Sequence, residues 1–186
     1  MDGFHYFCYM KWLLILVTIL AAAGTWWACS RKTYPALVTV PSVDLSRYAG
    51  RWYEIASLPN SFQKGCSCTF AEYTVTDKGY IEVHNYCRLA EKNKDNSITG
   101  KAFVTEGSNN SRLKVQFFWP FKGDYYIIDL ADDYSYALVG HPNRQYLWLL
   151  CRKSHPDEAV FTHLYGKAAQ NGFDTTRIVR TIHNCP

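Results

Sequence analysis

Short runs in which apolar and polar residues alternate, separated by turn-forming residues, repeat along the chain from residue 50 onward. Alternation with a period of two is typical of β-strands with one buried face. Runs of this kind cover residues 50–58, 68–76, 80–88, 97–105, 112–119, 125–131, 135–140 and 145–152. Short connections join them in order, and Asp77-Lys78-Gly79 is a strong hairpin signal. The pattern predicts an all-β protein, an eight-stranded antiparallel up-and-down β-barrel.

One amphipathic helix is predicted after the last strand. Ser154 and Asp157 have the spacing of a capping box, with Pro156 at an early helical position and Gly172 as the C-terminal cap. The apolar stripe at i, i+3, i+4 and i+7 consists of Phe161, Leu164, Tyr165 and Ala168. We expect this C-terminal α-helix to pack on the outside of the barrel, followed by a short strand at residues 177–182.

The start of the chain has the pattern of an export signal. Residues 12–24 form an uncharged apolar run after Lys11, too short to span a membrane comfortably and typical of a signal peptide. Ala28-Cys29-Ser30 resembles the end of a bacterial lipobox, in which the cysteine is acylated and becomes the first residue of the mature protein. The sequence therefore predicts a signal peptide at residues 1–29 and lipidation of Cys29. Ordinary cleavage followed by secretion is the alternative.

Residues 30–43 contain Pro35 and Pro41 and have little periodicity, so we predict a tether that continues into an extended lead-in. Asp44 is placed to cap one short helical turn. Residues 44–186 contain no internal repeat or low-complexity segment and are predicted to form one domain, for which the chain is long enough to bury a sizeable core.

Composition narrows the classes of function. The net charge is +4, but the basic residues are scattered, which argues against binding to nucleic acid. Aromatic residues make up 16% of the chain, which favours β structure and leaves rings to line a cavity. Outward positions such as Glu72 and Lys114 are too polar for lipid contact, which disfavours a transmembrane barrel. The sequence lacks the Gly-x-Ser-x-Gly, His-Glu-x-x-His and phosphate-loop motifs, so we predict no catalytic residues, no cofactor and no enzymatic activity.

The first predicted strand combines a large aromatic residue with a carboxylate. A period of two places Trp52, Glu54 and Ala56 on one face of residues 50–56. An unpaired carboxylate is costly in a solid core, so this face fits better against a cavity. The alternative is an ordinary strand with one bulky anchor.

Three short blocks, in order along the chain, resemble the signature of the lipocalin family. They are Gly50-Arg51-Trp52, the stretch from Asp133 and Tyr134 to Ala137, and Arg152. Residues 51–56, 58–62 and 146–148 and the ending Asn-Cys-Pro are similar to the bacterial outer-membrane and apolipoprotein D-like members of that family. The resemblance covers about residues 41–186. It implies a lipocalin barrel in which Arg152 lies across Trp52 at the closed end, a structural role.

The resemblance also implies a function. Lipocalins carry small hydrophobic ligands inside the barrel, so we expect an outer-membrane carrier of fatty acids or lysophospholipids that meets the membrane through Cys29. The resemblance places five residues on the inner face of the barrel: Tyr73, Asn85, Cys87, Phe117 and Trp148. A period of two adds Glu54 and also Ala71, Val83, Val115, Trp119 and Leu150. The alternative is that these side chains simply fill the barrel.

Export implies an oxidising compartment, so the cysteines are expected to form disulfides. With Cys29 acylated, five cysteines remain in the domain, and an odd count leaves at least one thiol free. The resemblance implies a Cys68–Cys185 bridge between the second strand and the C-terminal tail. Cys66 and Cys87 could form a second bridge, with Cys151 a buried free thiol. A zinc site is disfavoured because no second paired motif accompanies Cys66 and Cys68.

Two other classes of function stay open at this point. Some lipocalin-fold proteins isomerise lipids with a thiol inside the barrel, and Cys87 would be that thiol here. Such a thiol needs a neighbouring base or cation, and His84 is predicted to face outward. An interaction module is the third class, because lipocalins also bind partners through rim loops and some form homodimers. Phe62, Phe118 and Phe121 are its candidate contacts.

Overall fold

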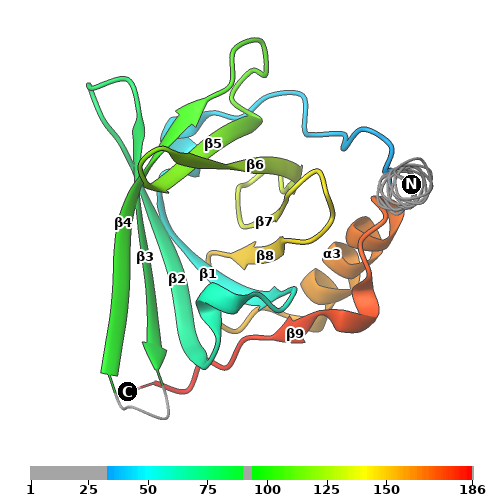
Figure 1. The fold of residues 1–186 in the computed structure, drawn as a ribbon. Helices are drawn as coiled ribbons and strands as arrows, with labels where there is room; N and C mark the ends of the chain where they lie inside the picture. The colour runs from blue at the N-terminus through cyan, green and yellow to red at the C-terminus, as the bar shows by residue number, and fades with distance from the viewer. Residues whose placement is uncertain (1–32, 90–93, 186) are drawn as a thin grey trace, which may run out of the picture. The chain divides into compact units, whose positions relative to one another are not determined.

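Eight antiparallel strands form a closed barrel in the computed structural model, which describes residues 33–89 and 94–185 (Figure 1). The order is β2-β3-β4-β5-β6-β7-β8-β1, and pairing of β1 with β2 closes the ring. The strands are β1 Gly50–Ser57, β2 Cys66–Val75, β3 Ile81–Leu89, β4 Lys94–Val104, β5 Arg112–Phe118, β6 Phe121–Leu130, β7 Tyr136–Gly140 and β8 Leu147–Cys151. The predicted up-and-down barrel is confirmed. The predicted signal peptide and Cys29 lie outside the described residues.

The boundaries of β1 to β8 lie within two residues of the predicted ones except at two strand starts. At the β2–β3 hairpin Gly79 has φ +76°, a conformation that L side chains rarely adopt, and Val75 pairs with Ile81. β4 begins at Lys94 instead of residue 97, and β6 at Phe121 instead of residue 125. Lys94 pairs with Leu89 although its side chain is exposed. These strand ends are held by backbone pairing alone. They lack the alternation of buried and exposed side chains by which strands are recognised in a sequence.

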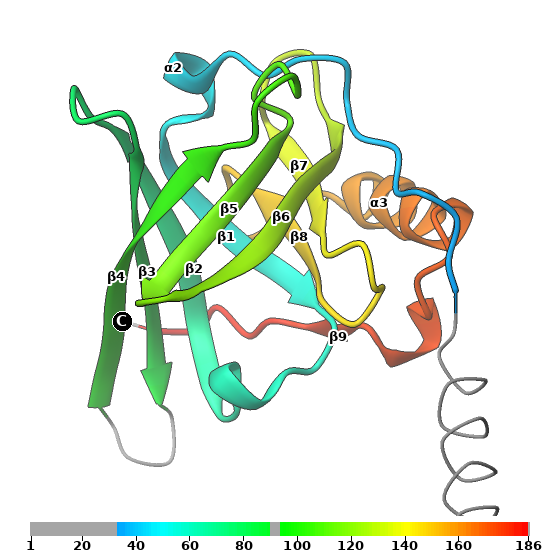
Figure 2. The same cartoon turned by 45° about the horizontal axis from the view of Figure 1, so that its top comes forward.

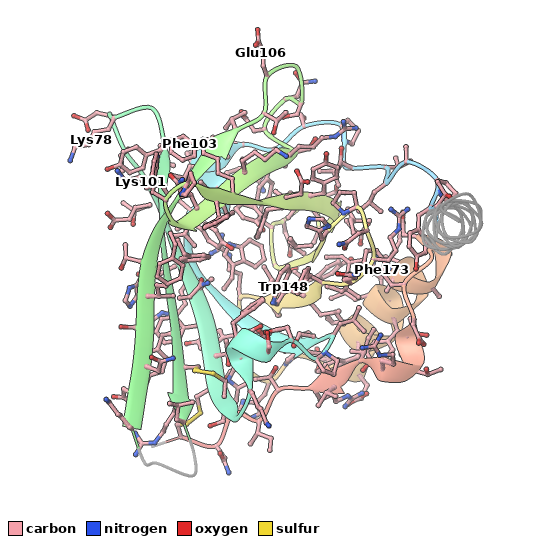
Figure 3. All side chains as sticks on the ribbon, viewed as in Figure 1. Lys78, Lys101, Phe103, Glu106, Trp148 and Phe173 are labelled. Atoms are coloured by element: carbon pink, nitrogen blue, oxygen red, sulfur yellow. A yellow bond between two sulfur atoms is a disulfide. The ribbon has the colours of Figure 1, made fainter. Side chains whose placement is uncertain are left out.

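The C-terminal part of the chain covers one side of the barrel. Helix α3 (Glu158–Gln170) buries Phe161, Leu164 and Ala168, so the predicted stripe is confirmed except that Tyr165 is only partly buried. This outer core also holds Ile55, Leu138, Leu147, Leu149 and Phe173, the last of which lies beside α3 in Figure 3. A 3-10 helix, η3 (Thr175–Arg177), then leads to β9 (Val179–Arg180), which pairs antiparallel with β1.

The N-terminus of α3 differs from the prediction, whereas the C-terminus agrees with it. The N-cap residue is Asp157, which makes no side-chain cap hydrogen bond, and Pro156 precedes the helix, so the predicted capping box is wrong. Asn171 is the C-cap residue, and Gly172 follows it with φ +78°, as expected for a helix end.

The lead-in lies against the outside of the barrel. The Val40 N–H donates to the carbonyl of Ile127 at 3.0 Å, and Leu37 and Val43 are buried. Helix α2 (Leu45–Tyr48) follows, and its N-cap Asp44 accepts hydrogen bonds from the N–H groups of Ser46 and Arg47, as predicted.

The two ends of the barrel are different (Figure 2). The closed end carries α2 and the β2–β3, β4–β5 and β6–β7 turns. The open end carries the loop at residues 58–65, which contains η1 (Ser61–Gln63), and the β5–β6 and β7–β8 turns. No helix within residues 33–89 and 94–185 combines the length and apolar character needed to cross a bilayer.

The outer core predicts the effect of Leu164→Ala. Leu164 is fully buried between α3 and the barrel, so the substitution should lower the free energy of unfolding by about 2–5 kcal/mol through lost burial and a residual cavity. Urea unfolding of the variant measures this change. Gln170→Ala, at an exposed position of the same helix, is the matched control and should stay within roughly 0.5 kcal/mol of the parent. Equal stability of the two variants would contradict the assigned packing.

Candidate ligand-binding site

One arginine closes the floor of the barrel. The guanidinium of Arg152 lies 3.9 Å from the ring centroid of Trp52, a side chain with no exposed surface. It also donates hydrogen bonds to the carbonyls of Arg47, Tyr48, Arg51 and Tyr134. The indole N–H of Trp52 donates to the carbonyl of Tyr48 at 2.7 Å. Burial lowers the pKa of Arg152 from its usual value, but an arginine remains charged at neutral pH, so the cation–π contact is retained.

The other signature residues surround this contact. Gly50 has φ +86°, and a Cβ there would lie 3.5 Å from Nη1 of Arg152. Tyr134 accepts a hydrogen bond on its hydroxyl from the N–H of Asp44 at 2.9 Å. Asp133 accepts from the N–H of Ser135 at 2.9 Å, and hydrogen bonds from Ser135 hold the pKa of this carboxyl below its ordinary range. The three sequence blocks therefore meet at the closed end.

Three buried tyrosines lie above the floor. The hydroxyl of Tyr125 is 2.8 Å from those of both Tyr48 and Tyr73. Burial raises the pKa of Tyr73 to about 12 and raises those of Tyr48 and Tyr125 well above the usual value. All three hydroxyls are therefore neutral at physiological pH, and the lower barrel presents an uncharged, mainly aromatic surface.

Exposure of the inner face changes along the barrel axis. In the closed half Val83, Ala102 and Leu113 are buried, together with Tyr73. Toward the open end five inner-face side chains are only partly buried, Ala71, Asn85, Val115, Phe117 and Trp148, whereas Cys87 in its disulfide is buried. Trp148 projects from β8 into the ring of strands (Figure 3). Solvent therefore reaches part of the inner face in the open half.

Glu54 has the partners that the sequence did not identify. Its carboxylate, in a residue only 6% exposed, accepts hydrogen bonds from the hydroxyls of Ser57 and Thr181 at 2.9 Å and from the side-chain amide of Gln63 at 2.6 Å. The carbonyl oxygen of the same Gln63 side chain accepts a hydrogen bond from the indole N–H of Trp148 at 3.1 Å. Among the described residues no cation pairs with this carboxylate, so neutral donors alone satisfy it. The network connects β1, β8, the 58–65 loop and the C-terminal tail.

Both expected disulfides are present at the open end. Cys66 is bonded to Cys87 across β2 and β3, and Cys68 is bonded to Cys185 of the tail. Cys151 is buried as a free thiol, and burial raises its pKa, which keeps it protonated. Because Cys87 is in a disulfide, the predicted isomerase thiol is not available as a nucleophile, and that alternative is wrong for this structure. No cluster of three metal-ligating side chains occurs in the described part of the chain.

Two predicted inner-face residues have different outcomes. Asn85 pairs with Ala71 across β2 and β3, as a period of two requires, and it is partly buried. Trp119 does not line the barrel: its side chain is 86% exposed. β5 ends at Phe118, so the inward and outward alternation that holds for Phe117 no longer applies one residue beyond the strand.

Gln63, Thr181 and Tyr125 belong to the site and were missed from the sequence. Gln63 and Thr181 are in a loop and the tail, and Thr181 is 127 positions from the carboxylate it contacts. No local pattern could identify either residue. Tyr125 could have been identified from the sequence, because a period of two places it on the same face of β6 as Ile127. The residues Tyr125-Tyr126-Ile127-Ile128 are all apolar or aromatic, however, so the pattern did not show which face was inside.

Comparison with known proteins gives consistent matches. A family model of the lipocalin-like domain matches residues 43–183. The outer membrane lipoprotein Blc of Vibrio cholerae is 40% identical over 141 residues, covering 75% of this chain and 82% of the relative. The protein of the same name in Escherichia coli K12 is 37% identical over 168 residues, covering 90% and 95%. Apolipoprotein D of Mus musculus is 35% identical over 152 residues, covering 77% and 79%.

Among solved structures, insecticyanin from the tobacco hornworm Manduca sexta superposes with a TM-score of 0.68. It is 19% identical, and the superposition covers 82% of this chain and 87% of the other. At this level of identity the likeness shows a shared fold.

The closed-end geometry predicts that Arg152→Ala destabilises the protein without weakening ligand binding. Loss of the cation–π contact and of the hydrogen bonds to four backbone carbonyls should lower the free energy of unfolding by about 2–4 kcal/mol. Arg152→Lys keeps the positive charge but lacks the planar guanidinium that donates several hydrogen bonds at once, so an intermediate loss of stability is expected. Urea unfolding and titration with a fluorescent fatty acid measure the two properties. An unchanged unfolding midpoint for Arg152→Ala would refute the structural role.

Proposed function

The chain belongs to the lipocalin family, and on this premise we propose that it binds single acyl-chain lipids in the barrel while it is held at the outer membrane by an acylated Cys29. The observation that carries the proposal is the gradient of exposure along the inner face. Phe117 and Trp148 are partly buried near the open end, above a floor that Trp52 and Arg152 close completely.

The chemistry of the interior favours an acyl chain. The inner face is aliphatic and aromatic, and its buried hydroxyls are neutral, as on Tyr73 and Tyr125. Apolar walls with a few placed polar groups are typical of sites for hydrophobic ligands. A ligand that enters a barrel closed at one end lies along its axis, so a narrow, flexible hydrocarbon chain is the best fit.

Glu54 determines where the polar head of the ligand lies. Its carboxylate lies toward the open end and already accepts hydrogen bonds from three donors, so it offers no donor to an anionic head group buried inside the barrel. Burying a second negative charge beside it would be costly. The carboxylate of a fatty acid, or the head group of a lysophospholipid, is therefore placed at the open end, in water.

The anchor is supported by the leader and by the relatives. Ala28-Cys29-Ser30 has the lipobox-like form, and the matched relatives in V. cholerae and E. coli are named outer membrane lipoproteins. The E. coli match covers 90% of this chain, more than the domain from residue 33 onward could supply, so it extends into the leader. The two disulfides fit an exported protein. A secreted, unanchored carrier resembling apolipoprotein D is the alternative.

Two tryptophans of opposite placement provide the test. Trp148→Ala should weaken binding of a fluorescent fatty acid on the order of tenfold, because one large apolar wall contact and its link to Gln63 are lost. Trp119→Ala removes the same side chain from an exposed position and should bind like the parent. Circular dichroism of both variants checks that the barrel is intact. Equal affinity in Trp148→Ala and Trp119→Ala would argue against ligand binding in the barrel.

A further inference from the structure

The β5–β6 turn is an exposed aromatic surface, which we call the aromatic turn and define as residues 118–122. Phe118, Trp119 and Phe121 are 67%, 86% and 76% exposed, and Lys122 beside them is also exposed. Three neighbouring aromatic rings in water are costly unless another surface covers them. The candidate ligand site does not use these three side chains, which are largely exposed to solvent.

Exposed aromatic side chains collect at one end of the molecule. Phe62, in the 58–65 loop, is 61% exposed at the open end, and the exposed ring of Tyr34 lies beside Arg144 of the β7–β8 turn. In the described residues the exposed large apolar side chains at the closed end are valines, Val75 and Val104. The asymmetry indicates a surface specific to the open end.

Charge is distributed in the same way. The described open-end connections, residues 58–65, 118–122 and 141–146, contain the exposed Lys64 and Lys122 and the buried Arg144, and no acidic residue; Asp95 and Asp124 lie in the adjoining strand starts. The closed-end turns contain the acidic side chains Asp77, Glu106, Asp132 and Asp133 together with Lys78; Lys78 and Glu106 are both labelled on these turns in Figure 3. The open-end loops therefore present exposed lysines with no acidic residue among them, whereas the closed-end turns carry both signs of charge. An anionic surface would attract these lysines.

The lead-in also begins at the open end. Arg144 donates a hydrogen bond to the carbonyl of Pro35 at 2.8 Å and lies 5.3 Å from the ring centroid of Tyr34. Cys29 is five residues before Tyr34, and five residues span at most about 18 Å. An acyl group on Cys29 would therefore hold the open end close to the bilayer. This step rests on the anchor of the proposed function, whereas the aromatic and charge asymmetries do not.

We propose that the open end docks on the surface of an anionic phospholipid bilayer, with the aromatic turn inserted at the level of the head groups. Trp, Tyr and Lys are suited to this interface because each combines an apolar body with a polar or charged tip. In this orientation the mouth of the barrel faces the membrane, and a lipid passing between bilayer and barrel keeps its acyl chain away from water.

Fluorescence quenching tests the orientation. The full chain, processed by its cell, is reconstituted into vesicles of phosphatidylethanolamine and phosphatidylglycerol whose acyl chains are brominated. The difference in tryptophan emission between the parent and Trp119→Phe is the emission of Trp119. We expect brominated lipid to quench this emission and aqueous iodide to leave it unchanged. Replacing phosphatidylglycerol by phosphatidylcholine should reduce the quenching by brominated lipid, because Lys64 and Lys122 lose their anionic partner.

Val104→Trp in the Trp119→Phe background is the matched control. It moves the reporter to an exposed position at the closed end, where iodide should quench it and brominated lipid should not. Quenching of Trp119 by iodide alone would overturn the docking. So would protection of Trp119 from both quenchers in a protein that sediments as a dimer, because a second copy would then cover the turn.

Mass spectrometry of the mature N-terminus separates this proposal from the anchor. If Cys29 proves unacylated, the anchor fails, and the same quenching is measured after the vesicles are added to the free protein. Quenching by brominated lipid then supports docking through the turn alone, and its absence overturns docking.

Discussion

The contact between Arg152 and Trp52 is the constraint on which the rest of the structure depends. One guanidinium covers the indole and holds the carbonyls of α2, β1 and the β6–β7 turn. These segments are far apart in sequence, and the contact brings them together at one end of the barrel. Because that end is closed, the lipid that we propose would enter through the open end.

The two ends consequently have different physical roles. The closed end is built from buried rings, neutral hydroxyls and a satisfied cation, which together confer stability. The open end has a partly exposed inner face, two disulfides that fasten β2 to β3 and to the tail, and a hydrogen-bond network around Glu54. The disulfides and the network restrain this end, where the inner face is partly exposed to solvent.

Local patterns predicted the fold well because each strand has a half-buried face and each turn its own chemistry. The stripe on α3 and the hairpin at Gly79 were predicted for this reason. The pairing of Trp52 with Arg152 and of Cys68 with Cys185 came from the family resemblance, since nothing local connects residues a hundred positions apart. The failures also have physical causes. Trp119 lies one residue beyond the end of its strand, and the partners of Glu54 come from a loop and the tail, which carry no periodic signal.

The central claim is that the barrel holds one acyl-chain lipid, and native mass spectrometry of the protein isolated from its own envelope tests it most directly. The account predicts one co-purified lipid with a single acyl chain per polypeptide, retained in Arg152→Lys and lost in Trp148→Ala. A parent protein that carries no lipid, or a lipid that Trp148→Ala retains fully, would contradict the claim.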